Sequence, residues 1–284
     1  MCDIGRIDYK LVERSDRLMR PVIRMDEVLN ELPWDKALAQ ATNQLKELIG
    51  RYGEDSVGFV ISSDATNEEA FALAKLATET GAAHNLRLLA GKRAERVEFA
   101  GGFVIESDRS PNERGVFDIL SRFLPSAAVE AVTDMRSLAG KKGLYVLCGP
   151  HSDAERIGAL AEAARKAKLV VVQATLPSAL TEAAAIVFPG ATYAEKDGTL
   201  TNSRGLVQLI RPAFAPPREA RADLAILLQF CDAMGIATRF RTAGEAAAEI
   251  ARELRGYPSH EQIGETGWKM ASSGAGLPAK GGEP

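Results

Sequence analysis

Two spacings of apolar residues alternate along the chain. Short continuous apolar runs predict strands, and longer segments with helical spacing predict helices between them. The predicted strands are residues 57–62, 97–105, 144–148, 169–173 and 185–188. The predicted helices are residues 34–49, 66–80, 112–123, 152–168, 218–234 and 243–255. Continuous apolar strands that alternate with helices are typical of a parallel sheet covered on both faces. The pattern therefore predicts an α/β fold with a doubly wound, mostly parallel sheet.

The same pattern suggests how the chain is divided. Residues 1–35 show no sustained period and are interpreted as an extended junction arm, followed by an α/β domain at 36–235. Residues 236–268 are predicted to form a closing helical segment, and 269–284, rich in Gly, Ala and Ser, a flexible tail. The predicted loop at 189–205 is long for a compact domain, which favours a functional or interface role.

Charge and hydropathy exclude several classes of function. The formal net charge of -3 leaves no electrostatic footprint for nucleic acid, and no apolar run approaches the ~20 residues of a membrane span. The N-terminus lacks the apolar core of a secretory signal. We therefore expect a cytoplasmic protein that binds no nucleic acid and is not inserted in a membrane. Any association with a membrane would occur through other proteins.

Cysteine and histidine spacings give little support for a metal or nucleophilic site. Cys2, Cys148 and Cys231 are far apart, which predicts neither a disulfide framework nor a C-x-x-C metal site. Cys148 and Cys231 lie in apolar segments and are expected to be buried. The three histidines are not within helical reach of one another. No catalytic residue is predicted.

Two loops remain as generic candidates. The turn at 149–153 begins a predicted helix and could hold a phosphate on its backbone N–H groups. However, Pro150 removes one donor and Asp153 would repel an anion, which favours a structural turn. Glu195 and Asp197 flank Lys196 in the long loop, where an ion-paired loop is favoured over acid–base catalysis.

The long loop and the strands before it resemble those of molybdopterin oxidoreductases. The resemblance rests on an E-x-x-G-T-x-x-N-x-x-G-x-x-Q pattern, which this chain supplies with Glu195, Gly198, Thr199, Asn202, Gly205 and Gln208. The resemblance implies a loop that helps to enclose a pterin cofactor. Alternatively, the same residues brace the loop against the sheet, because glycines permit turns with positive φ and an Asn can bridge backbone groups.

Three shorter motifs narrow the resemblance to the large iron–sulfur subunit of NADH:quinone oxidoreductase (complex I). They are the start at 2–9 (CDIGRIDY), the TNEE sequence at 66–69, and SPNERG at 110–115. In relatives, a cysteine at the place of Cys2 is the fourth ligand of a 4Fe-4S cluster whose other ligands lie upstream. A single thiolate cannot hold such a cluster. We therefore expect no cluster in this chain alone, although a complete subunit or a partner chain could provide the missing ligands.

The resemblance also implies what should be missing. Active molybdenum or tungsten members usually bring a metal ligand from the region where this chain has no cysteine, between Cys2 and Cys148. The domain is also roughly half the usual length. We therefore expect no molybdopterin, and a pterin loop (Glu195, Gly198, Thr199, Asn202, Gly205) that is vestigial.

The leading hypothesis is a non-catalytic α/β scaffold in NADH:quinone oxidoreductase. Its partners would be other subunits of the complex I peripheral arm, which lies against the inner membrane. Alternatively, the chain is part of a formate-dehydrogenase-like molybdenum or tungsten enzyme that binds a pterin. The third hypothesis is an unrelated nucleotide-binding α/β protein that uses the turn at 149–153.

Overall fold

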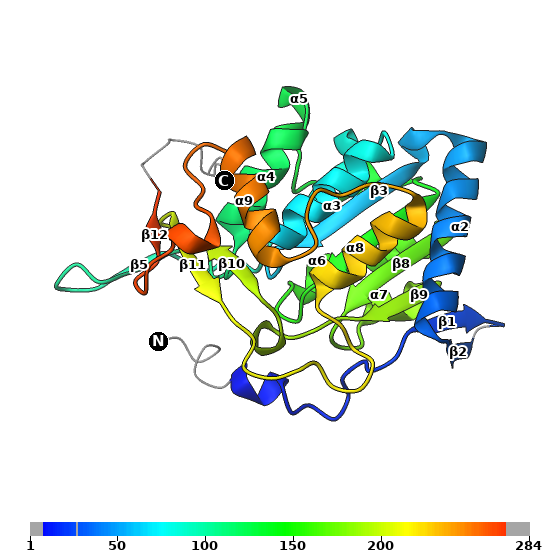
Figure 1. Cartoon of the computed structure of the whole chain (residues 1–284), viewed down its shortest axis with the longest axis horizontal. Helices are drawn as coiled ribbons and strands as arrows, with labels where there is room; N and C mark the ends of the chain where they lie inside the picture. Colours follow the sequence, from blue (N-terminus) through cyan, green and yellow to red (C-terminus); the bar gives the residue numbers. More distant parts are fainter. Residues whose placement is uncertain (1–7, 27, 271–284) are drawn as a thin grey trace.

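A seven-stranded sheet forms the centre of the molecule in a computed structural model that describes residues 8–26 and 28–270 (Figure 1). The strand order is β2-β1-β9-β8-β7-β3-β4. The five strands from β9 to β4 are parallel: β9 (Ile186–Pro189), β8 (Leu169–Ala174), β7 (Gly143–Cys148), β3 (Val57–Ser62) and β4 (Leu86–Leu89). Four of the predicted strands therefore lie in this sheet.

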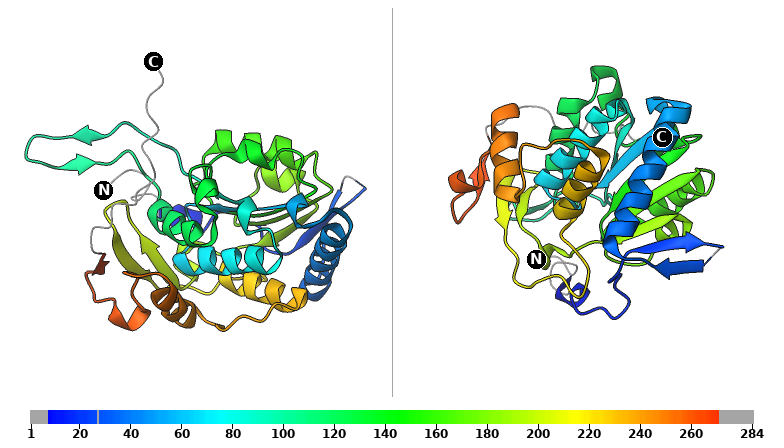
Figure 2. Two further views of the ribbon diagram at one scale, coloured as in Figure 1. Left: turned by 90° about the horizontal axis from the view of Figure 1, so that it is seen from above. Right: turned by 45° about the vertical axis from the view of Figure 1, so that its right-hand side comes forward.

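Helices cover both faces of the sheet (Figures 1 and 2). One face packs against α2 (Trp34–Tyr52), α3 (Asn67–Glu79), α4 (Glu113–Phe123), α8 (Asp223–Met234) and α9 (Ala243–Glu253). The other face packs against α6 (Ala154–Ala164) and α7 (Ala179–Ala183). The doubly wound α/β fold predicted from the sequence is therefore confirmed.

Alternating residues of the central strands divide the core into two layers. Phe59 of β3 and Tyr145 of β7 face the layer under α2, α3 and α8. Their neighbours Val60 and Val146 face the layer under α6 and α7. Every residue of β3, β7 and β8 is buried, which explains why their sequences are continuously apolar rather than alternating.

The first 35 residues are more ordered than the sequence indicates. After η1 (Asp8–Leu11), strands β1 (Val22–Met25) and β2 (Val28–Glu31) form an antiparallel hairpin that extends the sheet beyond β9. Each strand has only four residues, so neither produces a detectable period. The segment predicted as an extended arm thus contributes the edge of the sheet.

The predicted strand at 97–105 is wrong, and the strand that takes its place in the sheet, β4, was not predicted. Residues 97–105 form part of a hairpin, with β5 (Val97–Glu98) and β6 (Val104–Ile105) outside the main sheet. β4 is hidden in the sequence by Arg87, which interrupts its apolar run. That buried guanidinium is satisfied by Ser137 Oγ at 2.6 Å and by two backbone carbonyls.

The predicted long loop at 189–205 contains regular structure as well. It includes the 3-10 turn η5 (Tyr193–Glu195) and strand β10 (Gly198–Thr201). β10 pairs with β11 (Leu206–Ile210), which pairs with β12 (Trp268–Lys269), giving a second, antiparallel sheet of three strands. The strands β10 and β11 have only four and five residues, too few to show a strand pattern.

The remaining elements are short. They are α5 (Ser126–Val129) and the 3-10 helices η2 (Glu54–Ser56), η3 (Ala83–Asn85), η4 (Met135–Leu138) and η6 (His260–Gln262). The helix predicted at 218–234 begins only at Asp223. Cys2 and most of the predicted tail at 269–284 lie outside the described residues. Within residues 8–26 and 28–270, no helix has both the length and the apolarity needed to cross a membrane.

The start of α3 follows the sequence prediction closely. Thr66 Oγ1 accepts the N–H of Glu69 at 3.2 Å, and Glu69 Oε2 accepts the N–H of Thr66 at 2.8 Å, which is a capping box. We expect Thr66→Ala to lower the free energy of unfolding by ~1 kcal/mol, because Glu69 N–H loses its acceptor. Urea denaturation followed by circular dichroism would measure this.

Thr78→Ala provides the matched control in the same helix. The Thr78 hydroxyl donates to the carbonyl of Ala74 at 2.8 Å, a local bond inside the helix that adds little to stability. We expect a change within about 0.5 kcal/mol. Equal losses for the two variants would contradict the capping role of Thr66.

Candidate functional site

A pocket of about 440 Å³ opens at the carboxyl ends of the parallel strands. The chain runs from β3 outward to β4 and then returns to β7, so the direction of winding changes between β3 and β7. Ligands of open α/β sheets bind at this switch point. Residues from the ends of β3, β4, β7, β8 and β9 line the pocket, including Ala65, Gly91, Leu147, Thr175 and Ala191.

The walls of the pocket are mainly apolar, and its charged groups lie at two levels. Leu147, Pro150, Leu200 and Ile210 provide apolar surface. Lys92 and Arg109 are exposed, whereas the lining residues Asp64, Lys196 and Asp223 are buried or nearly so. A planar ring with polar edges therefore suits the interior, and an anionic group suits the side of Lys92 and Arg109.

The turn that follows β7, at residues 149–153, is closed by the protein's own side chains. Gly149 N–H donates to Ser62 Oγ at 2.9 Å, and His151 N–H donates to Asp64 Oδ2 at 2.7 Å. Asp153 caps α6 by accepting the N–H of Arg156 at 3.0 Å. Two of the amides that could have bound a phosphate at this turn therefore already donate to the protein's own side chains. These contacts favour a structural role for the turn over a phosphate site, as the sequence did.

Asp64 is the carboxylate that holds this turn. A Cβ at Gly149 would lie 2.3 Å from the Asp64 Cβ, so only glycine lets the two loops approach this closely. Burial raises the pKa of Asp64, and the neighbouring His151 opposes that rise. His151 Nε2 also lies 2.7 Å from Asp8 Oδ1 of η1, which places the N-terminal segment against the pocket.

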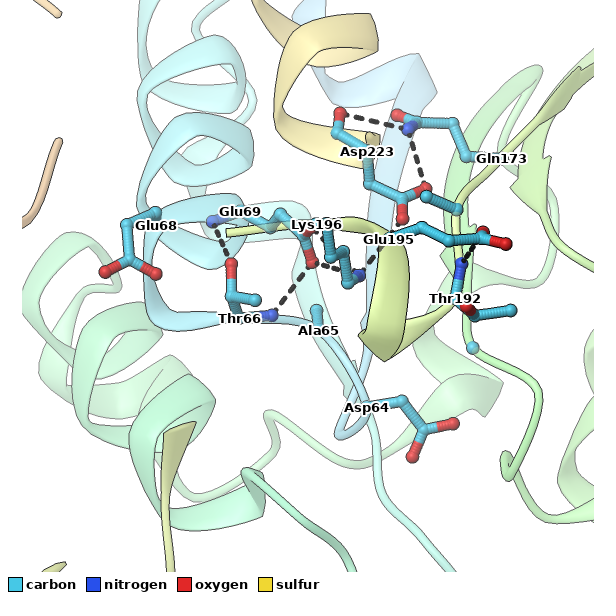
Figure 3. Close-up of polar contacts among 12 residues, drawn as sticks. Asp64, Ala65, Thr66, Glu68, Glu69, Gln173, Thr192, Glu195, Lys196 and Asp223 are labelled. Atoms are coloured by element: carbon cyan, nitrogen blue, oxygen red, sulfur yellow. Dashed lines mark hydrogen bonds and ion pairs between the residues drawn. The ribbon is translucent and has the colours of Figure 1, made fainter. Parts of the chain in front are cut away.

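Lys196 and Asp223 of the pocket lining belong to a buried ion triad with Glu69 (Figure 3). Lys196 Nζ lies 2.9 Å and 3.0 Å from the two carboxylate oxygens of Glu69, and 3.1 Å from Asp223 Oδ2. Gln173 Nε2 donates to Asp223 Oδ1 at 3.2 Å. The triad has two carboxylates for one ammonium, so it carries an excess of negative potential.

The pKa values of Glu69 and Lys196 reflect this excess of carboxylates over ammonium groups. Burial raises the pKa of Glu69 to about 7, because the low-dielectric interior disfavours its charge. For Lys196, burial opposes the charge, but Glu69 and Asp223 outweigh it and raise the pKa of the ammonium. Of the triad, only Lys196 was noted from the sequence, as a charge in the long loop; its two partners come from α3 and α8.

Glu195 and Thr199 from the predicted pterin loop contact the protein itself. Glu195 accepts two hydrogen bonds of 2.6 Å from Arg17, and the two side chains are 2% and 1% exposed. Thr199 donates from its hydroxyl to Glu68 Oε1 at 2.7 Å and from its N–H to Glu68 Oε2 at 2.8 Å. Neither residue is among those that line the pocket.

The other three loop residues shape the backbone. A Cβ at Gly198 would lie 2.8 Å from Glu68 Oε2, so glycine allows the close approach of β10 to α3. Asn202 Oδ1 accepts the N–H groups of Arg204 and Leu206, both at 3.0 Å, and Gly205 adopts a φ of +74°. From this region, the pocket is instead lined by Tyr193, Lys196, Leu200 and Ile210.

Two motifs that lie far apart in the sequence meet next to β10. Asn67 Nδ2 donates to the hydroxyl oxygens of Thr199 and Thr201 at 2.9 Å and 3.0 Å. Asn112 Oδ1 accepts the N–H of Thr201 at 2.6 Å, and Asn112 Nδ2 donates to the Ala65 carbonyl at 2.7 Å. We call Asn67, Asn112 and Thr201 the asparagine knot. It fixes β10, and therefore the loop that carries Lys196.

The cysteines within the described residues are buried, as predicted. Burial raises the pKa of both Cys148 and Cys231 to about 12. Cys148 lines the pocket, and its Sγ lies 3.8 Å from the Gly149 carbonyl oxygen. In the part of the chain that the structure describes, no three His, Cys, Asp or Glu side chains are grouped as metal ligands would be.

Comparisons with known proteins identify relatives. The sequence model of the molybdopterin oxidoreductase family matches residues 17–104 and 120–233. The chain is 33% identical over 144 residues to the F420-dependent formate dehydrogenase 1 subunit alpha of Methanococcus maripaludis, covering 48% of this chain and 21% of that protein. It is 32% identical over 127 residues to the NADPH-Fe(3+) oxidoreductase subunit alpha of Geobacter sulfurreducens, covering 44% of this chain and 15% of that protein.

A solved structure supports the fold. The acetylene hydratase from Pelobacter acetylenicus superposes with a TM-score of 0.61 and 10% sequence identity. The match covers 96% of this chain and 69% of the hydratase chain. At this identity the likeness concerns the fold alone.

Proposed function

Since the chain belongs to the molybdopterin oxidoreductase family, we propose that it is the nucleotide-binding α/β part of a formate-dehydrogenase-like oxidoreductase. In this proposal the switch-point pocket binds the nucleoside end of a pterin dinucleotide. The observation that carries the proposal is the pocket itself, with apolar walls, a polar floor and exposed basic residues. Family membership excludes the third hypothesis, an unrelated nucleotide-binding protein.

The residues of the pocket fit part of such a cofactor. A volume of about 440 Å³ lies within the range of small-molecule sites and suits a bicyclic base with its sugar, rather than a whole dinucleotide. A Cβ at Gly91 would lie 2.0 Å from Ser110 Oγ, so the bare backbone there forms a narrow wall. Lys92 and Arg109 are placed to bind a phosphate.

This proposal replaces the expectation that the pterin has been lost. The family suggests a molybdopterin cofactor in the full protein. When bound, such a cofactor would supply the redox chemistry through its metal. This chain's own part would be to bind one end, orient it against the sheet and exclude water from it. The aligned segments span only 15% and 21% of the two curated relatives, so the activity of the whole protein is itself part of the proposal.

A second candidate is the scaffold role in NADH:quinone oxidoreductase, with the other peripheral-arm subunits as partners. The contacts of Glu195 and Thr199 favour it, because both side chains bond the protein and neither lines the pocket. The closed turn at 149–153 points in the same direction. In this reading Cys2 would complete a 4Fe-4S cluster only with ligands from elsewhere.

Cofactor content of the native assembly tests the proposal. We expect an assembly isolated from the source organism through this chain to release about one equivalent of pterin and of nucleotide per chain. Gly91→Leu should lower both at least tenfold, because a Cβ at this position would lie 2.0 Å from Ser110 Oγ and would force the pocket wall at Ser110 to move. Pterin fluorescence after acid oxidation and nucleotide chromatography measure the two contents.

Gly50→Ala provides the matched control. A Cβ at Gly50 in α2 would meet nothing within 4 Å, so cofactor content should stay as in the wild type. Wild-type assemblies without pterin and nucleotide would refute the proposal and leave the scaffold role. Equal content in Gly91→Leu and the wild type would show that the cofactor lies in another part of the assembly.

A further inference from the structure

A two-stranded ribbon, residues 93–108, projects away from the body of the molecule (Figure 2, left). We call it the hairpin arm. A bridge between Arg93 and Asp108 and the hydrogen bond from Ala94 N–H to the Ser107 carbonyl, 3.0 Å long, close it at its base. At its tip, Gly101 and Gly102 turn the chain with φ values of +95° and +82°. A lone two-stranded ribbon is only marginally stable in water.

The tip of the arm is apolar and exposed. Phe99 and Phe103 are 48% and 60% exposed, and their ring centroids lie 5.7 Å apart. Within the described residues, this ring pair faces mostly solvent. Aromatic side chains are enriched in the centres of protein interfaces, where their burial contributes most to binding. The tip is thus built like an interface anchor.

The arm carries more acidic than basic side chains. Residues 93–108 contain two basic and four acidic side chains, which gives a formal charge of -2. Arg96 pairs with Glu98 at 3.1 Å and with Glu106 at 3.5 Å. A ribbon with a net negative charge gives no attraction to anionic lipid or nucleic acid. The balance favours a protein as the occupant of the tip.

The arm begins at the mouth of the switch-point pocket. Gly91, Lys92, Arg109 and Ser110, which flank the arm on both sides in sequence, all line the pocket. Tyr193 lines it as well and is 40% exposed. A protein domain that binds the hairpin arm would therefore also lie over the pocket mouth.

We propose that the hairpin arm and the pocket mouth together bind one further protein domain, which takes the Phe99–Phe103 pair into an apolar groove and covers the mouth at Tyr193. The continuity of the arm with the pocket rim supports a single occupant for both surfaces. The two curated relatives are both alpha subunits, so a domain of a partner subunit is the expected occupant. The inference holds whether or not a nucleotide fills the pocket.

Site-specific photo-crosslinking in the source organism tests this. Phe103→p-benzoylphenylalanine and, in a separate chain, Tyr193→p-benzoylphenylalanine are illuminated in the native assembly. We expect crosslinks from both positions to the same polypeptide region, identified by mass spectrometry. The double variant Phe99→Ser/Phe103→Ser should lose that region's protein at least tenfold from the purified assembly.

Met25→Ser is the matched control, because Met25 is similarly exposed (51%) but lies in the β1–β2 hairpin at the far edge of the sheet. It should retain the crosslinked protein. Thermal unfolding of the double variant should match that of the wild type, since the tip makes no core contact. Crosslinks to a second copy, to different regions from the two positions, or to none would overturn the proposal, as would full retention in the double variant.

Discussion

Replacing Lys196 by Met is expected to lower the free energy of unfolding by about 3–5 kcal/mol at pH 8. Lys196 is the ammonium between Glu69 and Asp223, at 2.9 Å and 3.1 Å, and all three side chains are buried. Its removal leaves two carboxylates facing one another in a low-dielectric interior. Removing one partner of a buried ion group costs far more than the intact group contributes, because the remaining charge is uncompensated.

The loss should depend on pH in a defined direction. In the wild type the pKa of Glu69 is raised by burial to about 7, from an ordinary value of 4.5. Between these values the folded state holds a proton that the unfolded state has released, so stability falls as the pH rises. Without Lys196 the pKa rises further. The deficit of the variant should therefore be smaller at pH 5 than at pH 8, measured by urea denaturation at each pH.

A neutral triad separates charge from packing. In the triple variant Glu69→Gln/Lys196→Met/Asp223→Asn, each carboxylate becomes an amide of nearly the same shape. Replacing a whole buried ion group in this way is often close to neutral. We expect this variant to regain more than half of the stability lost in Lys196→Met, with a flatter pH profile. A Lys196→Met loss that is the same at pH 5 and pH 8 would contradict the electrostatic account.

The fold was largely predictable because its signals are local. β3 is a continuous apolar run, and Thr66 stands three residues before the Glu69 that completes its capping box. The prediction of strands failed at β4, where contacts with distant residues determine the structure. β4 contains Arg87, and its guanidinium is buried with the help of Ser137, fifty residues away, which accepts one of its hydrogen bonds. Nothing in the local sequence around Arg87 indicates that partner.

The site was predictable only in part, for the same reason. The loop residues Glu195 to Gly205 were identified through their spacing, but spacing does not show which way a side chain faces. Lys196, between them, reaches the pocket, and its partners Glu69 and Asp223 lie 127 and 27 positions away. The asparagine knot likewise joins two motifs that the sequence showed separately. Chain separation of this size makes such partners invisible without the fold.

Gly115→Ala is the second substitution with a large expected effect. Gly115 lies in the first turn of α4, beneath the asparagine knot. A Cβ there would lie 2.0 Å from Asn67 Oδ1, 2.2 Å from Asn112 Oδ1 and 2.9 Å from Thr201 Oγ1. These neighbours are buried and hold β10, so they cannot move without losing hydrogen bonds.

Two costs add in this variant. Overpacking of a tight interior site costs ~1–3 kcal/mol, and each buried polar group that loses its partner costs ~1–3 kcal/mol more. We therefore expect Gly115→Ala to lower the free energy of unfolding by about 3–5 kcal/mol, although alanine is the better helix former. Hydrogen exchange should show the loss first at the N–H of Thr201, which donates to Asn112.

Gly158→Ala gives the comparison that isolates the steric cause. Gly158 lies in α6 on the other face of the sheet, and a Cβ there would meet nothing within 4 Å. Helix propensity alone should then raise its stability by up to ~1 kcal/mol. Opposite signs for the two glycine variants are the predicted result. If Gly115→Ala were also stabilising, α4 could shift without disturbing β10, and the asparagine knot would not be what fixes the strand beside the pocket.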